Sequence, residues 1–97
     1  MKRNDFLGVF KNTKPIIGML HLKGNSPDDV FERFKKELNI YIQSGIDGVM
    51  VENYYGNYED LKRALEYIKS NKISIPYGVN CLNIDYMGFY QAREFEC

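Results

Sequence analysis

The sequence contains no long hydrophobic run and no excess of charge of either sign. No apolar stretch approaches the roughly 20 residues that a membrane-spanning helix needs, so we expect no membrane span. Thirteen basic residues balance thirteen acidic ones, which removes the electrostatic argument for nucleic acid or an anionic membrane as a partner. The basic start Lys2-Arg3 is followed by Asn4-Asp5 and not by a sustained apolar core, so the N-terminus does not resemble a signal peptide.

Cysteine is scarce, and the glycine motifs of nucleotide-binding loops are missing. Cys81 and Cys97 have neither the spacing of a metal site nor that of a disulfide framework, and we expect Cys81 to be a buried, reduced thiol. The chain has no Gly-x-Gly-x-x-Gly and no Walker-type Gly-Lys-Ser/Thr, so no loop is predicted to hold a dinucleotide or a triphosphate. No Ser-His-Asp arrangement is recognisable. The absence of a disulfide framework favours the reducing cytoplasm, and the identity of any cofactor or metal stays unknown.

Strand and helix signals alternate along the chain. Three short apolar runs predict strands at residues 16–21, 47–53 and 77–82, and the segments between them predict helices over 27–44 and 58–70. Ser26 and Asn57 stand where an N-cap is expected, each followed by acidic residues in the first helical turn. Gly45 supplies a stop for the first helix.

Hydrophobic spacing predicts which side of each helix is buried. The first helix repeats an apolar residue every four positions, at Val30, Phe34, Leu38 and Ile42, and the second has Leu61, Leu65 and Ile68 on one face. We expect a third helix after Asp85, with Met87, Tyr90 and Phe95 as its apolar positions. Residues 5–10 are predicted to form a short helix or turn.

Apolar strands that alternate with helices of this length are typical of a parallel sheet, and we predict the α/β class. A parallel sheet of three strands leaves two edges unpaired. A domain of 97 residues is also marginal in the surface it buries. We therefore expect residues 1–97 to be the first part of a larger domain, with an obligate assembly such as a homo-oligomer as the alternative.

Polar residues follow the apolar part of each predicted strand. They are His21, then Glu52 with Asn53, and then Asn80. Functional sites in parallel sheets form at the carboxyl ends of the strands. If the first, second and fourth of these side chains share one face, alternation along a strand puts Met19, Met50 and Gly78 on that face too.

These residue types suit a small polar ligand. His21 can move a proton near neutral pH, Glu52 can act as a general base, and the amides Asn53 and Asn80 can orient a substrate hydroxyl or carbonyl. His21 and Glu52 are alternatively two ligands of a divalent ion, which is too few to name the metal. The structural alternatives are a packed histidine, a glutamate paired with a nearby cation, and amides that satisfy loop backbone groups.

Three further residues near the strand ends have two interpretations each. Tyr54 and Tyr55 form either a lid over the rim or a stacking platform. Asp85 is either a helix cap or a ligand-binding carboxylate.

At these same residues the sequence resembles the BtpA family. The matching pieces are KPIIGMLHL at 14–22, GIDGVMVEN at 45–53 and IPYGVNCL at 75–82, followed by Asn83 and Asp85. The resemblance implies a (β/α)₈ fold of the TIM-barrel type, of which residues 1–97 would hold about the first three βα units. It also adds Asn83 and Asp85 to the substrate-binding candidates.

The function that the resemblance implies is divided. The family is named after a role in accumulating photosystem I, which implies a non-catalytic assembly or stability factor. Other members are similar to metabolic TIM-barrel enzymes of sugar or nucleoside chemistry. We expect an enzyme acting on a small polar or phosphorylated metabolite, with the assembly factor and an inactive truncated fragment as alternatives.

Overall fold

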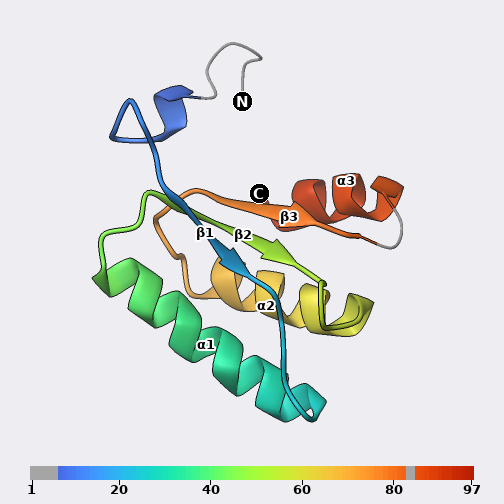
Figure 1. Cartoon of the computed structure of the whole chain (residues 1–97). Coiled ribbons are helices and arrows are strands. Elements are labelled where there is room, and N and C mark those ends of the chain that lie inside the picture. Colours follow the sequence, from blue (N-terminus) through green and yellow to red (C-terminus); the bar gives the residue numbers. More distant parts are fainter. Residues whose placement is uncertain (1–6, 83–84) are drawn as a thin grey trace.

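The computed structural model describes residues 7–82 and 85–97 (Figure 1). Its elements in chain order are the 3-10 helix η1 (Leu7–Val9), β1 (Ile17–Leu20), α1 (Pro27–Gln43), β2 (Gly48–Glu52), α2 (Tyr58–Ser70), β3 (Tyr77–Asn80) and α3 (Asp85–Glu94). The predicted alternation of strands and helices is confirmed. None of the described helices has the length and apolar character that a membrane crossing requires.

The three strands form one parallel sheet in the order β1-β2-β3. Met19 pairs with Met50, which pairs in turn with Gly78. The α/β class with a parallel sheet is therefore confirmed. The described residues form an open sheet, and the barrel expected from the family resemblance stays a prediction.

Both predicted helix starts are formed by the expected caps. The Ser26 hydroxyl accepts from the Asp29 N–H at 3.1 Å, and Pro27 is the first helical residue. At α2 the capping is reciprocal, because Asn57 Oδ1 accepts from the Asp60 N–H at 2.9 Å while Asp60 Oδ2 accepts from the Asn57 N–H at 3.0 Å. Such caps contribute about 1 kcal/mol each, so the two helices begin where the sequence places them.

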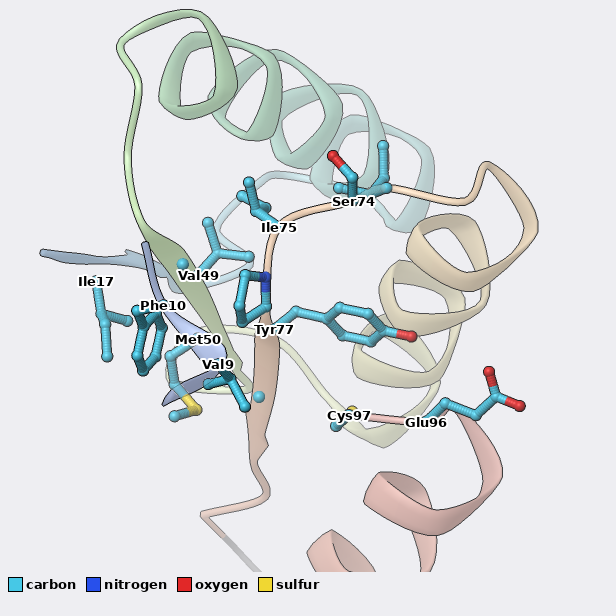
Figure 2. A pocket seen from close by; sticks show the side chains of 14 residues that line it. Val9, Phe10, Ile17, Val49, Met50, Ser74, Ile75, Tyr77, Glu96 and Cys97 are labelled. Atoms are coloured by element: carbon cyan, nitrogen blue, oxygen red, sulfur yellow. The ribbon is translucent and has the colours of Figure 1, made fainter. Parts of the chain in front are cut away.

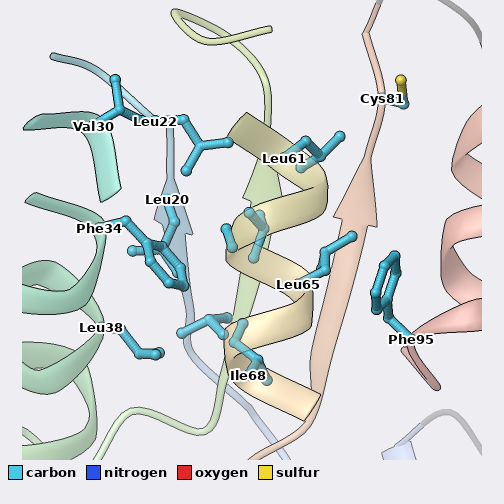
Figure 3. Packing of buried hydrophobic residues seen from close by; sticks show 13 residues of the cluster. Leu20, Leu22, Val30, Phe34, Leu38, Leu61, Leu65, Ile68, Cys81 and Phe95 are labelled. Carbon is cyan, nitrogen blue, oxygen red and sulfur yellow. The ribbon is translucent and has the colours of Figure 1, made fainter. Parts of the chain in front are cut away.

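The buried core lies between the sheet and the helices (Figure 3). Its members are the apolar residues Leu20, Leu22, Val30, Phe34, Leu38, Val49, Val51, Leu61, Ala64, Leu65, Ile68, Cys81 and Phe95. The predicted faces of the first two helices are confirmed except for Ile42, which is 36% exposed. Tyr41 covers β1 in its place: its hydroxyl donates to Met19 O at 3.0 Å, and its ring fills the space that a Cβ on Gly18 would occupy.

The third helix packs on the same face of the sheet as α1 and α2. The Tyr77 hydroxyl donates to the carbonyl of Phe95, and Lys69 Nζ donates to the Glu94 carbonyl at 2.9 Å, which ties the end of α3 to both β3 and α2. The expectation that Tyr90 is buried is wrong, since it is 64% exposed. Gln91 occupies the buried position, because it lies four residues before Phe95 on the face that meets the sheet.

The opposite face of the sheet is apolar, and η1 with Phe10 lies against its amino end. Ile17 and Met19 are 37% and 38% exposed there. A hollow of about 500 Å³ surrounds the amino ends of the strands, between Phe10, Met50 and Cys97 (Figure 2). It lies at the opposite end of the strands from the polar residues that follow them.

Gln91 provides a stability test of α3. Its side chain is 0% exposed, and within the described part of the chain neither amide atom has a hydrogen-bond partner. Gln91→Leu should therefore raise the free energy of unfolding, by about 1–3 kcal/mol, because a desolvated amide is removed. Chemical denaturation measures this, with Gln43→Leu on the exposed side of α1 as control. A destabilised Gln91→Leu would contradict the expectation.

Tyr77 should make stability depend on pH in the alkaline range. Burial raises the pKa of its phenol above 10.0, and the nearby Cys97 and Glu96 add to the effect. An acid whose pKa is higher in the folded state stabilises the fold below its unfolded pKa and loses that contribution as pH rises. The wild-type protein should therefore lose stability above about pH 10 more steeply than Tyr77→Phe.

At neutral pH the same substitution should cost about 0.5–1.5 kcal/mol for the lost hydrogen bond to Phe95. Denaturation at pH 7 and at several alkaline pH values measures both effects. Tyr55→Phe, on a ring that is 57% exposed, is the control. Equal alkaline slopes for Tyr77→Phe and the wild type would refute the assignment.

Candidate functional site at the carboxyl ends of the strands

His21 and Glu52 are in direct contact where β1 and β2 end. His21 Nε2 lies 3.0 Å from Glu52 Oε1. The Glu52 side chain is 11% exposed and that of His21 is 44% exposed. The pair is therefore a buried carboxylate beneath an imidazole that reaches the surface.

Asn80 completes the group from the third strand. Its Nδ2 donates to Glu52 Oε2 at 3.1 Å, and Asn80 pairs with Glu52 in the β2–β3 register. Glu52 Oε2 thus accepts from Asn80, and Oε1 is in contact with His21. The structure brings together the three side chains that the alternation argument placed on one face.

Asn53 points away from this group. It is 3% exposed, and its Oδ1 accepts from the backbone N–H of Leu82 at 2.8 Å. It therefore satisfies a loop backbone group, which was the structural alternative for this residue. A contact between Asn53 and a ligand stays an untested prediction.

Two other predicted site residues are not placed by the structure. Asn83 lies outside the described residues. Asp85 begins α3, but its side chain is not among those described. Their proposed contacts with substrate stay predictions.

The loop that carries His21 is tightly packed. The Tyr55 N–H donates to His21 O at 3.1 Å, which extends the β1–β2 pairing past the strands. The next residue, Leu22, is 2% exposed and has φ 59°, a left-handed conformation that costs a non-glycine residue about 1–2 kcal/mol. A Cβ on Gly56 would lie 3.0 Å from Leu22 O, so the two loops touch through this glycine.

Aromatic rings and one cation surround the imidazole. The ring centroid of His21 lies 5.3 Å from that of Tyr54 and 6.2 Å from that of Tyr55. Lys23 Nζ lies 5.0 Å from the Tyr55 ring centroid. The two tyrosines are 60% and 57% exposed, so the rim of the site, formed by Tyr54 and Tyr55, is accessible to solvent.

Lys23 and Leu22 were missed in the sequence. Lys23 lies two positions after His21, and this spacing was its only signal. The left-handed backbone of Leu22 has no signal in an apolar residue, because glycine and asparagine are the usual markers of that conformation.

The candidate ligands for a metal ion are few. Among residues 7–82 and 85–97, no three side chains of the types His, Cys, Asp and Glu gather closely enough to hold an ion. His21 and Glu52 supply two ligand types, and an amide oxygen of Asn80 would be a weak third. The arrangement is better suited to proton transfer and hydrogen bonding, since Glu52 is already in contact with His21 and Asn80.

Comparisons with known proteins add one relative. No family model matches the chain, and no solved structure matches it. A curated protein of Methanocaldococcus jannaschii, described only as uncharacterized, is 31% identical over 100 residues, which cover 84% of this chain and 38% of that protein. The chain thus spans about two fifths of the length of the curated relative it matches. The description of that relative names no activity.

Gly56 tests how tightly the site loops are packed. In Gly56→Ala the new Cβ would meet Leu22 O, Leu22 Cβ and Asp60 Oδ2, all at 3.0 Å. Two of these atoms belong to the backbone or lie next to it, so they cannot swing aside. The expected loss is about 1–3 kcal/mol of unfolding free energy.

Thermal or chemical denaturation checks this value. Gly8→Ala is the matched control, because nothing lies within 4 Å of its added Cβ. It should change stability by less than about 0.5 kcal/mol. If both variants are equally stable, the close approach of the two loops is not present in solution.

Proposed function

We propose that the protein is an enzyme that binds a small polar metabolite at the carboxyl ends of its strands. The observation that carries the proposal is the group formed by His21, Glu52 and Asn80. Three neighbouring strands each deliver one polar side chain to the same point, and a carboxylate is buried there to hold an imidazole at the surface. Burying a carboxylate costs desolvation free energy that an exposed carboxylate does not pay. A role in binding or catalysis would explain why this cost is tolerated.

A phosphorylated substrate is the favoured class. Lys23 places a positive charge on the rim beside Tyr55, within reach of an anionic group on a ligand at His21. The resemblance to the BtpA family supports a sugar-type or nucleoside-type compound. The chain contains free cysteines, which is compatible with the cytoplasm as its location.

We further propose that these residues begin a (β/α)₈ barrel. The helices α1, α2 and α3 cover one face, so each right-handed crossover continues the sheet in the same direction. In a doubly wound sheet the direction reverses, and the helices after the reversal lie on the other face. The much greater length of the archaeal relative leaves room for the further βα units.

The test uses the protein expressed from its complete native gene. Polar and phosphorylated metabolites are screened by thermal unfolding, where a ligand at 100 times its Kd stabilises by about 2.7 kcal/mol. His21→Ala and Glu52→Gln should each lose the ligand-induced shift or the turnover that follows binding. Glu66→Gln, an exposed carboxylate on α2, is the matched control and should keep both.

The result that would rule out the proposal is a hit whose shift and turnover survive in both site variants. Such a ligand would bind elsewhere. A screen of all these classes without any hit would count equally against it.

A non-catalytic assembly factor is the second candidate. The exposed aromatic rim formed by Tyr54 and Tyr55 favours it, since aromatic residues are enriched at the centres of protein interfaces. Substituting both tyrosines by serine would then abolish capture of a specific partner at native abundance. Capture that is unchanged, or no partner at all, would leave the enzyme as the proposal.

A further inference from the structure

The contact between His21 and Glu52 fixes which ring nitrogen carries hydrogen. An ionised carboxylate has no proton to donate, and two lone pairs 3.0 Å apart would repel each other, so the contact between Nε2 and Oε1 places the hydrogen on Nε2. In a neutral imidazole the other nitrogen, Nδ1, then has a free lone pair. Glu52 therefore selects the tautomer of His21.

Nδ1 is the nitrogen that remains for a ligand. Within the described part of the chain, the partners of the His21 ring are Glu52 and the two tyrosine rings, and none of these bonds Nδ1. The side chain is 44% exposed. The nitrogen that Glu52 does not hold is therefore the one left to bind a ligand at this surface.

Glu52 is poorly placed to react with the same ligand. The residue is 8% exposed, its Oε2 accepts a hydrogen bond from Asn80, and its Oε1 is in contact with His21 Nε2. A general base needs an accessible lone pair within hydrogen-bond reach of the proton that it removes. The buried carboxylate therefore interacts with the imidazole and is not available to the ligand.

We infer that His21 Nδ1 is the proton-transfer group of this site and that Glu52 is a positioning residue acting through it. The inference rests on the proposed function. The Nδ1 lone pair takes a proton from an O–H or N–H of the substrate, whose bonding electron pair stays on the substrate atom. The resulting imidazolium carries a hydrogen on each nitrogen, the charge of Glu52 stabilises it, and Nδ1 returns the proton to the product.

Asn80 has a defined part in this arrangement. Its amide holds the second oxygen of Glu52, which keeps the carboxylate plane turned so that Oε1 faces the imidazole. It thereby limits the rotation of Glu52 about its last bond. Asn80 is a second positioning residue, one step further from the reacting nitrogen.

The first measurement follows His21, the one histidine among residues 1–97. In long-range ¹H–¹⁵N spectra of the complete protein, the signals that disappear in His21→Gln belong to this ring, and its two nitrogen shifts report which of them is protonated. The wild type at a pH where the ring is neutral should show only the form protonated on Nε2. Glu52→Ala should show a mixture of the two forms. A mixture, or protonation on Nδ1, in the wild type overturns the inference.

The second measurement separates positioning from contact with the ligand. Because Glu52 does not touch the substrate, Glu52→Gln should keep the ligand-induced thermal shift and KM but lower kcat by about 10²–10⁴-fold. His21→Gln should lower kcat at least as much. If Glu52→Gln abolishes binding, or if its kcat is unchanged, the assignment of roles is wrong.

A third readout follows the ring during binding. Added ligand should move the ¹⁵N shift of Nδ1 more than that of Nε2, whereas a ligand that moves mainly Nε2 would contradict the inference. If the protein binds a metabolite but His21 is protonated on Nδ1, or if the ligand acts mainly on Nε2, this inference alone is overturned. A protein that binds none of the screened metabolites overturns the proposed function with it.

Discussion

The parallel register of the three strands is the constraint on which the other features depend. Met19, Met50 and Gly78 lie side by side, so the residues two positions further on, His21, Glu52 and Asn80, must also meet. A shift of one residue in any strand would turn its polar end toward the helices and bury it without a partner. One geometric fact thus builds both the apolar face and the polar group at its end.

Sequence reasoning reached most of this because its signals are local. Caps such as Asn57 and alternation along a strand depend on near neighbours, and the structure has both. It failed where a side chain's role depends on a distant gap: Tyr41, and not Ile42, covers β1 because Gly18 leaves room for a ring. That contact joins residues far apart in the chain, and the hydrophobic period of a helix carries no information about it.

The candidate site shows the same division. Residue type and strand position were enough to select His21, Glu52 and Asn80. Asn53 differs from them because its side chain accepts from the backbone N–H of Leu82, a contact between two loops that residue type does not predict. The division of roles within the site needed distances, because only the contact from Nε2 to Oε1 and the burial of Glu52 distinguish the group that reacts from the group that supports it.

The sheet face opposite the helices has a chemical consequence of its own. Met19 is partly exposed there beside Met50, and thioethers in contact with water oxidise to polar sulfoxides. A sulfoxide on this face would oppose whatever apolar surface packs against it. Oxidation of the two methionines by peroxide would therefore make this sheet face more polar.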